Sequence, residues 1–162
     1  MVEKISKRLA ILINQANPQT SSVPVLSYSI SVMLNFLSIL IFSTLIGYLF
    51  DKLADTIIAL FSFILLRAFS GGYHLKSLDG CVVVTVGIMV SIPHILMIPL
   101  ITLILNIISV VLVLLLAPNN VFDEVRVSRE KYPLLKIISF IIVCTNFIFT
   151  SPILTLSFFI SL

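Results

Sequence analysis

Long apolar runs alternate with short polar connections over most of this chain, and each run is a candidate membrane-spanning helix. A helix needs about 20 apolar residues to cross the hydrocarbon core of a bilayer. The run that starts at Cys81 continues to Ala117, which is too long for one crossing, so we expect a turn near Pro99 to Thr102. The predicted spans are about 26–49, 54–69, 81–100, 102–117, 134–150 and 153–162.

The first 17 residues have a different periodicity. Apolar side chains recur there at helical spacing, at Val2, Ile5, Leu9, Leu12 and Ala16. Lys4, Lys7 and Arg8 fall mostly elsewhere around the same helix. This pattern predicts an amphipathic helix over 1–17 that lies in the headgroup region, with a soluble arm as the alternative.

Together the runs predict an all-α membrane protein. We expect a polytopic bundle of about five to six transmembrane helices, preceded by the interfacial helix, in one membrane-embedded domain over 1–162. The last run, 153–162, is too short for a full helical crossing.

Composition supports the same class of protein. Hydrophobic residues make up 59% of the 162 residues and charged residues only 10%, and the mean hydropathy is +1.22. A soluble domain carries about 25% charged residues, so the surface of this chain must face lipid. The net charge of +3 is small and spread over the connections, which argues against a nucleic-acid partner. No pattern indicates a metal or another cofactor.

The distribution of Lys and Arg predicts the orientation. Connections rich and poor in these residues alternate along the chain: the N-terminal arm and the connections around 67–80 and 118–136 carry two or more, and the others carry one or none. By the positive-inside rule, the N-terminus and the 67–81 loop face the cytoplasm.

The residue types that could perform catalysis are concentrated in the polar, glycine-rich segment 67–81. This segment contains His74, one of the two histidines, and Cys81, one of the two cysteines. On one continuous helix these two would lie about 10 Å apart along the axis, too far for proton transfer. The turn signal Asp79–Gly80 predicts a break after which the apolar helix begins. His74 can then fold back toward Cys81, and a thiol near a helix start ionises more readily.

The same residues have a plain structural interpretation, in which His74 caps a helix end and Cys81 is a small packing residue. Cys144 lies inside an apolar run and is expected to be a buried, inert thiol. His94 follows Pro93, and we expect it to face the bundle interior and bind a freed backbone carbonyl. No Cys/His cluster completes a set of metal ligands.

Arg67, then Gly71–Gly72 and His74, and finally Cys81 together resemble the signature of the accessory gene regulator B family. The basic N-terminal helix and the basic connection that ends at Lys136 match the layout of that family, so the resemblance covers nearly the whole chain. These proteins are membrane cysteine endopeptidases of Gram-positive bacteria that process precursors of quorum-sensing peptides. The resemblance implies that His74 and Cys81 are catalytic.

The resemblance also implies a partner, a membrane-associated precursor peptide of the AgrD type in the lipid bilayer of the cell membrane, and leaves a homodimer open. Supporting roles are expected for Arg67, Gly71, Gly72, Ser77 and Asp79, and an acidic peptide tail is expected to bind Arg126, Arg129, Lys131 and Lys136. Each has a simpler interpretation: Asp79 as a turn former or cap, Arg67 as a lipid-phosphate anchor, and the basic connection as a topology signal.

A small transporter or peptide-export subunit without covalent chemistry is the competing class. Transporters place ionisable residues deep in their spans. In this chain only His94 qualifies. The acidic residues lie in connections, in the N-terminal arm or, in the case of Asp55, at the very start of a span, which favours the peptidase.

Overall fold

The computed structural model describes residues 2–17, 19–71, 77–118 and 131–162, and within them the chain is helical apart from short turns. In chain order the helices are α1 (Val2–Ala16), α2 (Val23–Leu49), α3 (Leu53–Ser70), α4 (Leu78–Ser91), the 3-10 turn η1 (Ile92–His94), α5 (Pro99–Leu116), α7 (Tyr132–Phe149) and α8 (Pro152–Ser161). The predicted all-α membrane fold is confirmed.

Four of these helices, α2, α3, α5 and α7, are long and apolar enough to cross a membrane. They correspond to the predicted spans over 26–49, 54–69, 102–117 and 134–150. The other two apolar helices are shorter. At 1.5 Å per residue α4 is about 21 Å long and α8 about 15 Å, so α8 reaches only part of the way through a bilayer of about 30 Å.

The predicted turn near Pro99 to Thr102 is wrong. Helix α4 ends at Ser91, η1 follows, and α5 already begins at Pro99. Proline is well suited to the first turn of a helix, because it has no N–H to leave unpaired and its φ is already helical. The preceding Ile98 is extended (φ −75°, ψ 150°), as the residue before a proline prefers. The turn therefore lies at 95–98.

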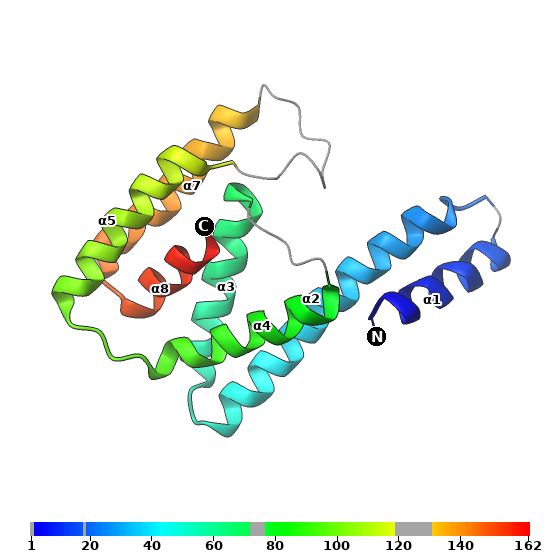
Figure 1. The fold of residues 1–162 in the computed structure, drawn as a ribbon, viewed down its shortest axis with the longest axis horizontal. Coiled ribbons are helices and arrows are strands. Elements are labelled where there is room, and N and C mark those ends of the chain that lie inside the picture. Colours follow the sequence, from blue (N-terminus) through cyan, green and yellow to red (C-terminus); the bar gives the residue numbers. More distant parts are fainter. Residues whose placement is uncertain (1, 18, 72–76, 119–130) are drawn as a thin grey trace.

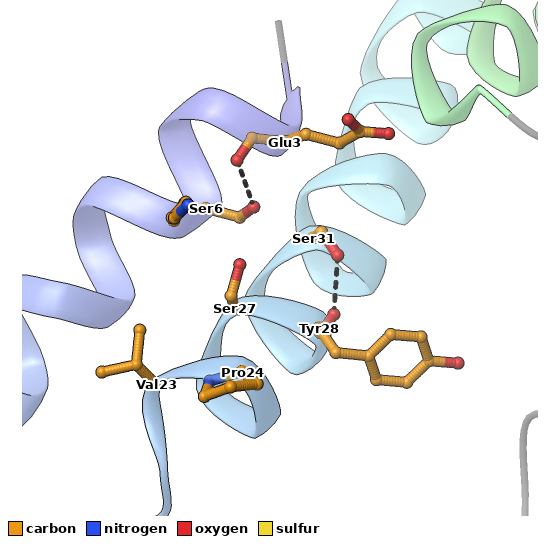
Figure 2. A pocket seen from close by; sticks show the side chains of 8 residues that line it. Glu3, Ser6, Val23, Pro24, Ser27, Tyr28 and Ser31 are labelled. Atoms are coloured by element: carbon orange, nitrogen blue, oxygen red, sulfur yellow. Dashed lines mark hydrogen bonds between the residues drawn. The ribbon is translucent and has the colours of Figure 1, made fainter.

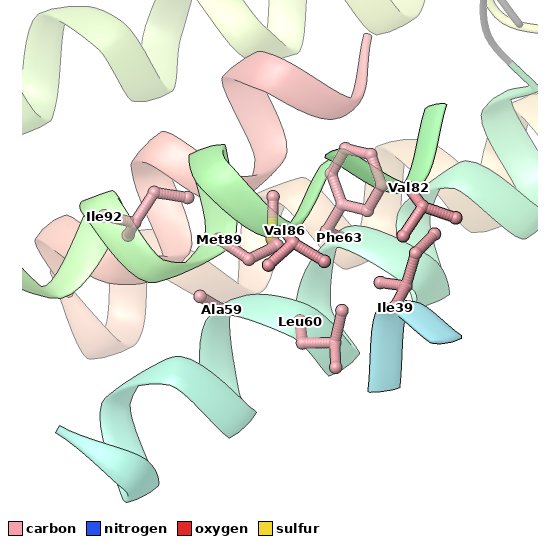
Figure 3. Packing of buried hydrophobic residues seen from close by; sticks show 8 residues of the cluster. All are labelled: Ile39, Ala59, Leu60, Phe63, Val82, Val86, Met89 and Ile92. Carbon is pink, nitrogen blue, oxygen red and sulfur yellow. The ribbon is translucent and has the colours of Figure 1, made fainter. Parts of the chain in front are cut away.

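The helices form a bundle, and α1 together with the first half of α2 extends from it as an arm (Figure 1). Antiparallel neighbours α2 and α3, and α5 and α7, make its walls, and α8 lies between α3 and α5. Helix α4 packs on α2, and Ile39, Phe63, Val82 and Met89 belong to the shared apolar core that Figure 3 shows.

Side chains are sorted as expected for a protein in lipid. Many large apolar residues are exposed, among them Leu115 (73%) and Ile148 (82%), while small polar residues such as Ser109 and Ser139 are fully buried. The hydroxyls of Ser109 and Ser139 donate to backbone carbonyls one turn back, at 2.9 Å in both cases. Small buried side chains let helices approach closely, which drives helix association where lipid is as apolar as the protein.

Helix α1 folds back along the first half of α2 (Figure 1). It is amphipathic, as predicted, but the residues that it buries are small or short: Val2, Ser6 and Ala10. Figure 2 shows the cavity of about 400 Å³ between the two helices, lined by Ser6 and, on α2, by Ser27 and Ser31. Apart from Val2, the predicted apolar face, which includes Leu9 and Leu12, stays exposed and is free to contact lipid.

Candidate active site

Cys81 lies in the first turns of α4, and Ser77 fixes the start of that helix. The Ser77 backbone is extended (φ −106°, ψ 122°), and its Oγ accepts a hydrogen bond from the Gly80 N–H at 3.3 Å. The Cys81 N–H donates to the Ser77 carbonyl at 3.0 Å. The expectation that the helix starts after Asp79–Gly80 is therefore wrong. Serine is a strong N-terminal cap, and an acidic residue such as Asp79 is favourable in the first turn, at the positive end of the helix dipole.

The corrected start places Cys81 as the fourth residue of α4. It is still within the first turns, where the dipole of the helix favours a negative charge. His74 lies outside the described residues, and α4 does not extend back to its position.

The Cys81 thiol has a neighbour one turn further along α4. Its Sγ lies 3.9 Å from Oγ1 of Thr85, within the range of a weak hydrogen bond to sulfur, and both side chains are half-buried. Helical threonine hydroxyls commonly donate to the carbonyl one turn back, as Thr44 and Thr102 do here to Leu40 and Ile98. The Thr85 hydroxyl contacts the Cys81 thiol in this way. Cys81 forms no disulfide.

Asp79 contacts the start of α1. Its Oδ1 accepts a hydrogen bond from the Val2 backbone N–H at 3.0 Å. Hydrogen bonding from the amino terminus of the chain, and then from Val2, holds the pKa of the Asp79 carboxyl below its usual range. Asp79 thus joins α1 to the helix that carries Cys81. Ser77, not Asp79, is the cap.

Arg67 and Gly71 lie at the end of α3. The Arg67 guanidinium carbon is 5.5 Å from the ring centroid of Phe63, one turn back, and the side chain is half-buried. Helix α3 ends at Ser70, and Gly71 follows with φ 75°, a conformation that glycine adopts without strain. Gly71 therefore ends α3.

The remaining predicted site residues fall into two groups. Gly72, His74, Arg126 and Arg129 lie outside the described residues. Lys131 is exposed and directly precedes α7, and Lys136 is half-buried within the first turns of that helix. The start of α7 and the end of α3 lie toward the same end of the bundle (Figure 1).

His94 does not face the bundle interior, as the sequence had suggested. It is exposed at the end of η1, and its ring meets that of Phe50 edge to face, with centroids 5.8 Å apart. The reason is that α4 has already ended at Ser91, so His94 lies beyond the helix, in the turn that leads to α5. Cys144 is half-buried within α7 and forms no disulfide.

Two contacts at the site were missed from the sequence. Thr85 follows Cys81 at i+4, a spacing that places both on one helix face, so this neighbour could have been found. The hydrogen bond between Val2 and Asp79 joins residues that are 77 positions apart, and no pattern in the local sequence predicts it.

Helical topology, four helices able to span a membrane and a thiol at the start of an apolar helix define a polytopic membrane protein with a candidate thiol site. The sequence model of the accessory gene regulator B family matches residues 1–162, the whole chain. The protein belongs to this family, which is involved in accessory gene regulator processing. Comparison with curated proteins and with solved structures finds no match.

Proposed function

We propose that this protein is a membrane cysteine endopeptidase that cleaves a quorum-sensing precursor peptide and cyclises the retained fragment. The observation that carries the proposal is the position of Cys81 at the start of α4, in a chain whose full length matches the accessory gene regulator B family. A peptidase-like role follows from family membership, and the thiol supplies a nucleophile for it.

The first half of the reaction is acyl transfer to sulfur. His74 takes the proton of the Cys81 thiol, and the sulfur attacks the scissile carbonyl carbon of the bound peptide. The carbon–nitrogen bond breaks, the leaving amine takes the proton from the imidazolium, and the C-terminal fragment departs. The N-terminal fragment stays on Cys81 as a thioester. The first N–H groups of a helix have no acceptor within it and are suited to hold an oxyanion. In α4 the N–H groups of Gly80 and Cys81 already donate to Ser77, so the N–H of Leu78 is the one proposed for this role.

The second half resolves the thioester. A thiol or hydroxyl of the bound fragment attacks the acyl carbon and loses its proton, the bond to Cys81 breaks, and the sulfur is protonated again. The product is a thiolactone or a lactone. Attack by water instead would give a linear acid. Exchange between thioesters conserves the acyl-bond energy, so ring closure needs no ATP.

Supporting residues are assigned by their positions. Gly71 allows the chain to leave α3, and Ser77 caps the helix that carries the thiol. Asp79 acts through α1, because its carboxylate accepts the Val2 N–H. Arg67 could bind a peptide carboxylate through its donor fork while its stem rests on Phe63.

Substrate and location complete the proposal. The partner is a membrane-associated precursor of the AgrD type, and its acidic tail would bind the basic residues Arg126, Arg129, Lys131 and Lys136. The cell membrane is that of a Gram-positive bacterium, with the N-terminus and the active-site loop in the cytoplasm. The whole chain acts as one peptidase domain.

Buried polar groups favour a peptidase over a transporter. In the described part of the chain every buried polar residue is Ser, Thr or Asn, and none is ionisable. Coupled transport relies on ionisable groups deep in the spans. The one deep candidate from the sequence, His94, lies exposed at the end of η1.

Replacing each cysteine in turn tests the proposed nucleophile. Protein reconstituted in liposomes with its precursor peptide should lose cleavage in Cys81→Ala and retain it in Cys144→Ala, because only Cys81 lies at the site. Peptide fragments are measured by mass spectrometry, and circular dichroism checks that both variants fold. Equal loss in two folded variants would refute the assignment.

A further inference from the structure

The Thr85 hydroxyl is a polar group beside the Cys81 sulfur on α4. The two residues are four positions apart and therefore neighbours on one face of the helix, and Oγ1 lies 3.9 Å from Sγ. Thr44 on α2 shows the usual alternative, because its hydroxyl donates to the Leu40 carbonyl at 2.8 Å. Among the described residues the Thr85 hydroxyl bonds to no backbone carbonyl, so its proton is available to the sulfur.

The pair lies at the edge of the buried face of α4. Val82 and Val86, the residues that follow Cys81 and Thr85, belong to the apolar core that Figure 3 shows. Val83 is already exposed, whereas Cys81 and Thr85 are half-buried. Water screens a half-buried pair less than an exposed one, which strengthens a hydrogen bond to a charged atom.

The ionisation state of Cys81 decides which atom donates. While the sulfur is protonated, either atom could be the donor. A thiolate has no proton, so the Thr85 O–H is then the donor and the sulfur the acceptor. A hydrogen bond to an ionised acceptor is shorter and stronger than one between neutral groups. The hydroxyl therefore stabilises the thiolate more than the thiol.

We propose that Thr85 is a catalytic residue of the thiol site, whose hydroxyl donates to the Cys81 sulfur whenever that sulfur is negatively charged. The proposal rests on the proposed function, in which the sulfur carries this charge twice. It is first the nucleophile, after His74 has taken its proton, and later the leaving group of the thioester. Thr85 keeps its own proton in both steps, and none of its covalent bonds is made or broken.

The test is the pH dependence of Cys81 alkylation by iodoacetamide in a Cys144→Ala background, with Thr85→Val as a variant of the same shape without the hydroxyl. Loss of one hydrogen bond to a charged group should make ionisation about tenfold less favourable. The thiolate that remains becomes more nucleophilic, by about half of that change on a logarithmic scale. Thr85→Val should thus react roughly threefold more slowly on the acidic limb of the profile and roughly threefold faster on the alkaline plateau.

The crossing of the two profiles separates this role from packing, because a change in packing alone would alter both limits in the same sense. Thr85→Ser keeps the hydroxyl and should restore the original profile. Thr44→Val, which removes a half-buried hydroxyl from α2, is the matched control and should leave the profile unchanged. If Thr85→Val does not fold by circular dichroism, Thr85→Ala makes the same comparison.

Two outcomes are kept apart by measuring peptide cleavage in the same samples. Cleavage should fall in Thr85→Val and recover in Thr85→Ser. An alkylation profile that is unchanged, or uniformly slower, in a folded Thr85 variant would overturn the role of Thr85 and leave Cys81 as the nucleophile. Cleavage retained in Cys81→Ala would instead refute the proposed function, whatever the alkylation profiles show.

Discussion

At Cys81, three local features favour a reactive thiol. The residue is half-buried, it lies where the α4 dipole is positive, and its sulfur has the Thr85 hydroxyl one turn away. The thiol at Cys144 is half-buried as well, but it lies in the middle of a lipid-facing helix and lacks the other two features. The sequence alone separated the two cysteines by their neighbours, but it could not show that Ser77 caps the helix.

Replacing His74 tests whether this residue is the base that takes the proton of the Cys81 thiol. If His74 accepts the thiol proton, His74→Ala should slow alkylation of Cys81 by iodoacetamide at neutral pH and reduce peptide cleavage by roughly 10² or more. His94→Ala is the matched control, because His94 lies at the far end of α4 and η1, about 20 Å along the helix from Cys81. Loss of cleavage in His94→Ala, with His74→Ala unaffected, would place the active site elsewhere.

At the scale of helices, the packing of α2 on α3 depends on one close approach. A Cβ added at Gly47 would lie 2.7 Å from Oγ1 and 2.9 Å from Cβ of Thr56, a buried β-branched residue on α3. Neither atom can move far, because Thr56 itself has little rotamer freedom in a helix. Gly47 is therefore required by its neighbour.

Two glycine variants measure this effect. Gly47→Ala should destabilise the protein by about 1–3 kcal/mol through overpacking. Gly87→Ala on α4 should be neutral or stabilising by up to about 1 kcal/mol, since nothing lies within 4 Å of the added Cβ and alanine favours a helix. Unfolding by SDS titration, followed by circular dichroism, gives both values. Similar losses in the two variants would contradict the packing account.

Much of the helical architecture follows from the apolar runs, because lipid permits only hydrogen-bonded helices there. The bounds of α2, α3, α5 and α7 agree with the predicted spans to within about three residues. Turns were less predictable. Both Pro93 and Pro99 can end an apolar helix, and the sequence did not show that Pro99 would start one instead.

At the scale of the whole molecule, the antiparallel helices bring the end of α3, the start of α4 and the start of α7 toward one side of the bundle. Arg67, Cys81, Lys131 and Lys136 lie in these segments. The other side contains the Lys52–Asp55 ion pair at 3.7 Å. Basic residues are thus concentrated on the thiol side, which predicts that this side faces the cytoplasm.

Thiol labelling tests this orientation. In a Cys144→Ala background, a membrane-impermeant maleimide should label Cys81 in inverted vesicles and leave it unlabelled in intact cells. A cysteine introduced in place of exposed Leu96, in the turn between η1 and α5, serves as the control and should show the opposite pattern. Labelling of Cys81 from outside would reverse the topology and place peptide cleavage on the outer face.

The candidate site was only partly predictable. Residue types and spacing singled out Cys81 and His74, because the chain has only two cysteines and two histidines and one of each lies in the segment 67–81. The contact between Asp79 and Val2 depends on how α1 folds back along α2, and it joins residues that lie 77 positions apart in the sequence. The hydrogen bond between Asn106 and Asn146 likewise could not be predicted from the sequence, because it depends on how the fold brings the two residues together.

The most direct test of the account is detection of the acyl-enzyme. Protein mixed with its precursor peptide and quenched in acid is analysed by intact mass spectrometry and by peptide mapping. The account predicts an adduct with the mass of the N-terminal acyl fragment, located at Cys81, removed by hydroxylamine and absent from Cys81→Ala. Cleavage that proceeds with no adduct at Cys81, together with direct incorporation of oxygen from labelled water into the first product, would contradict it.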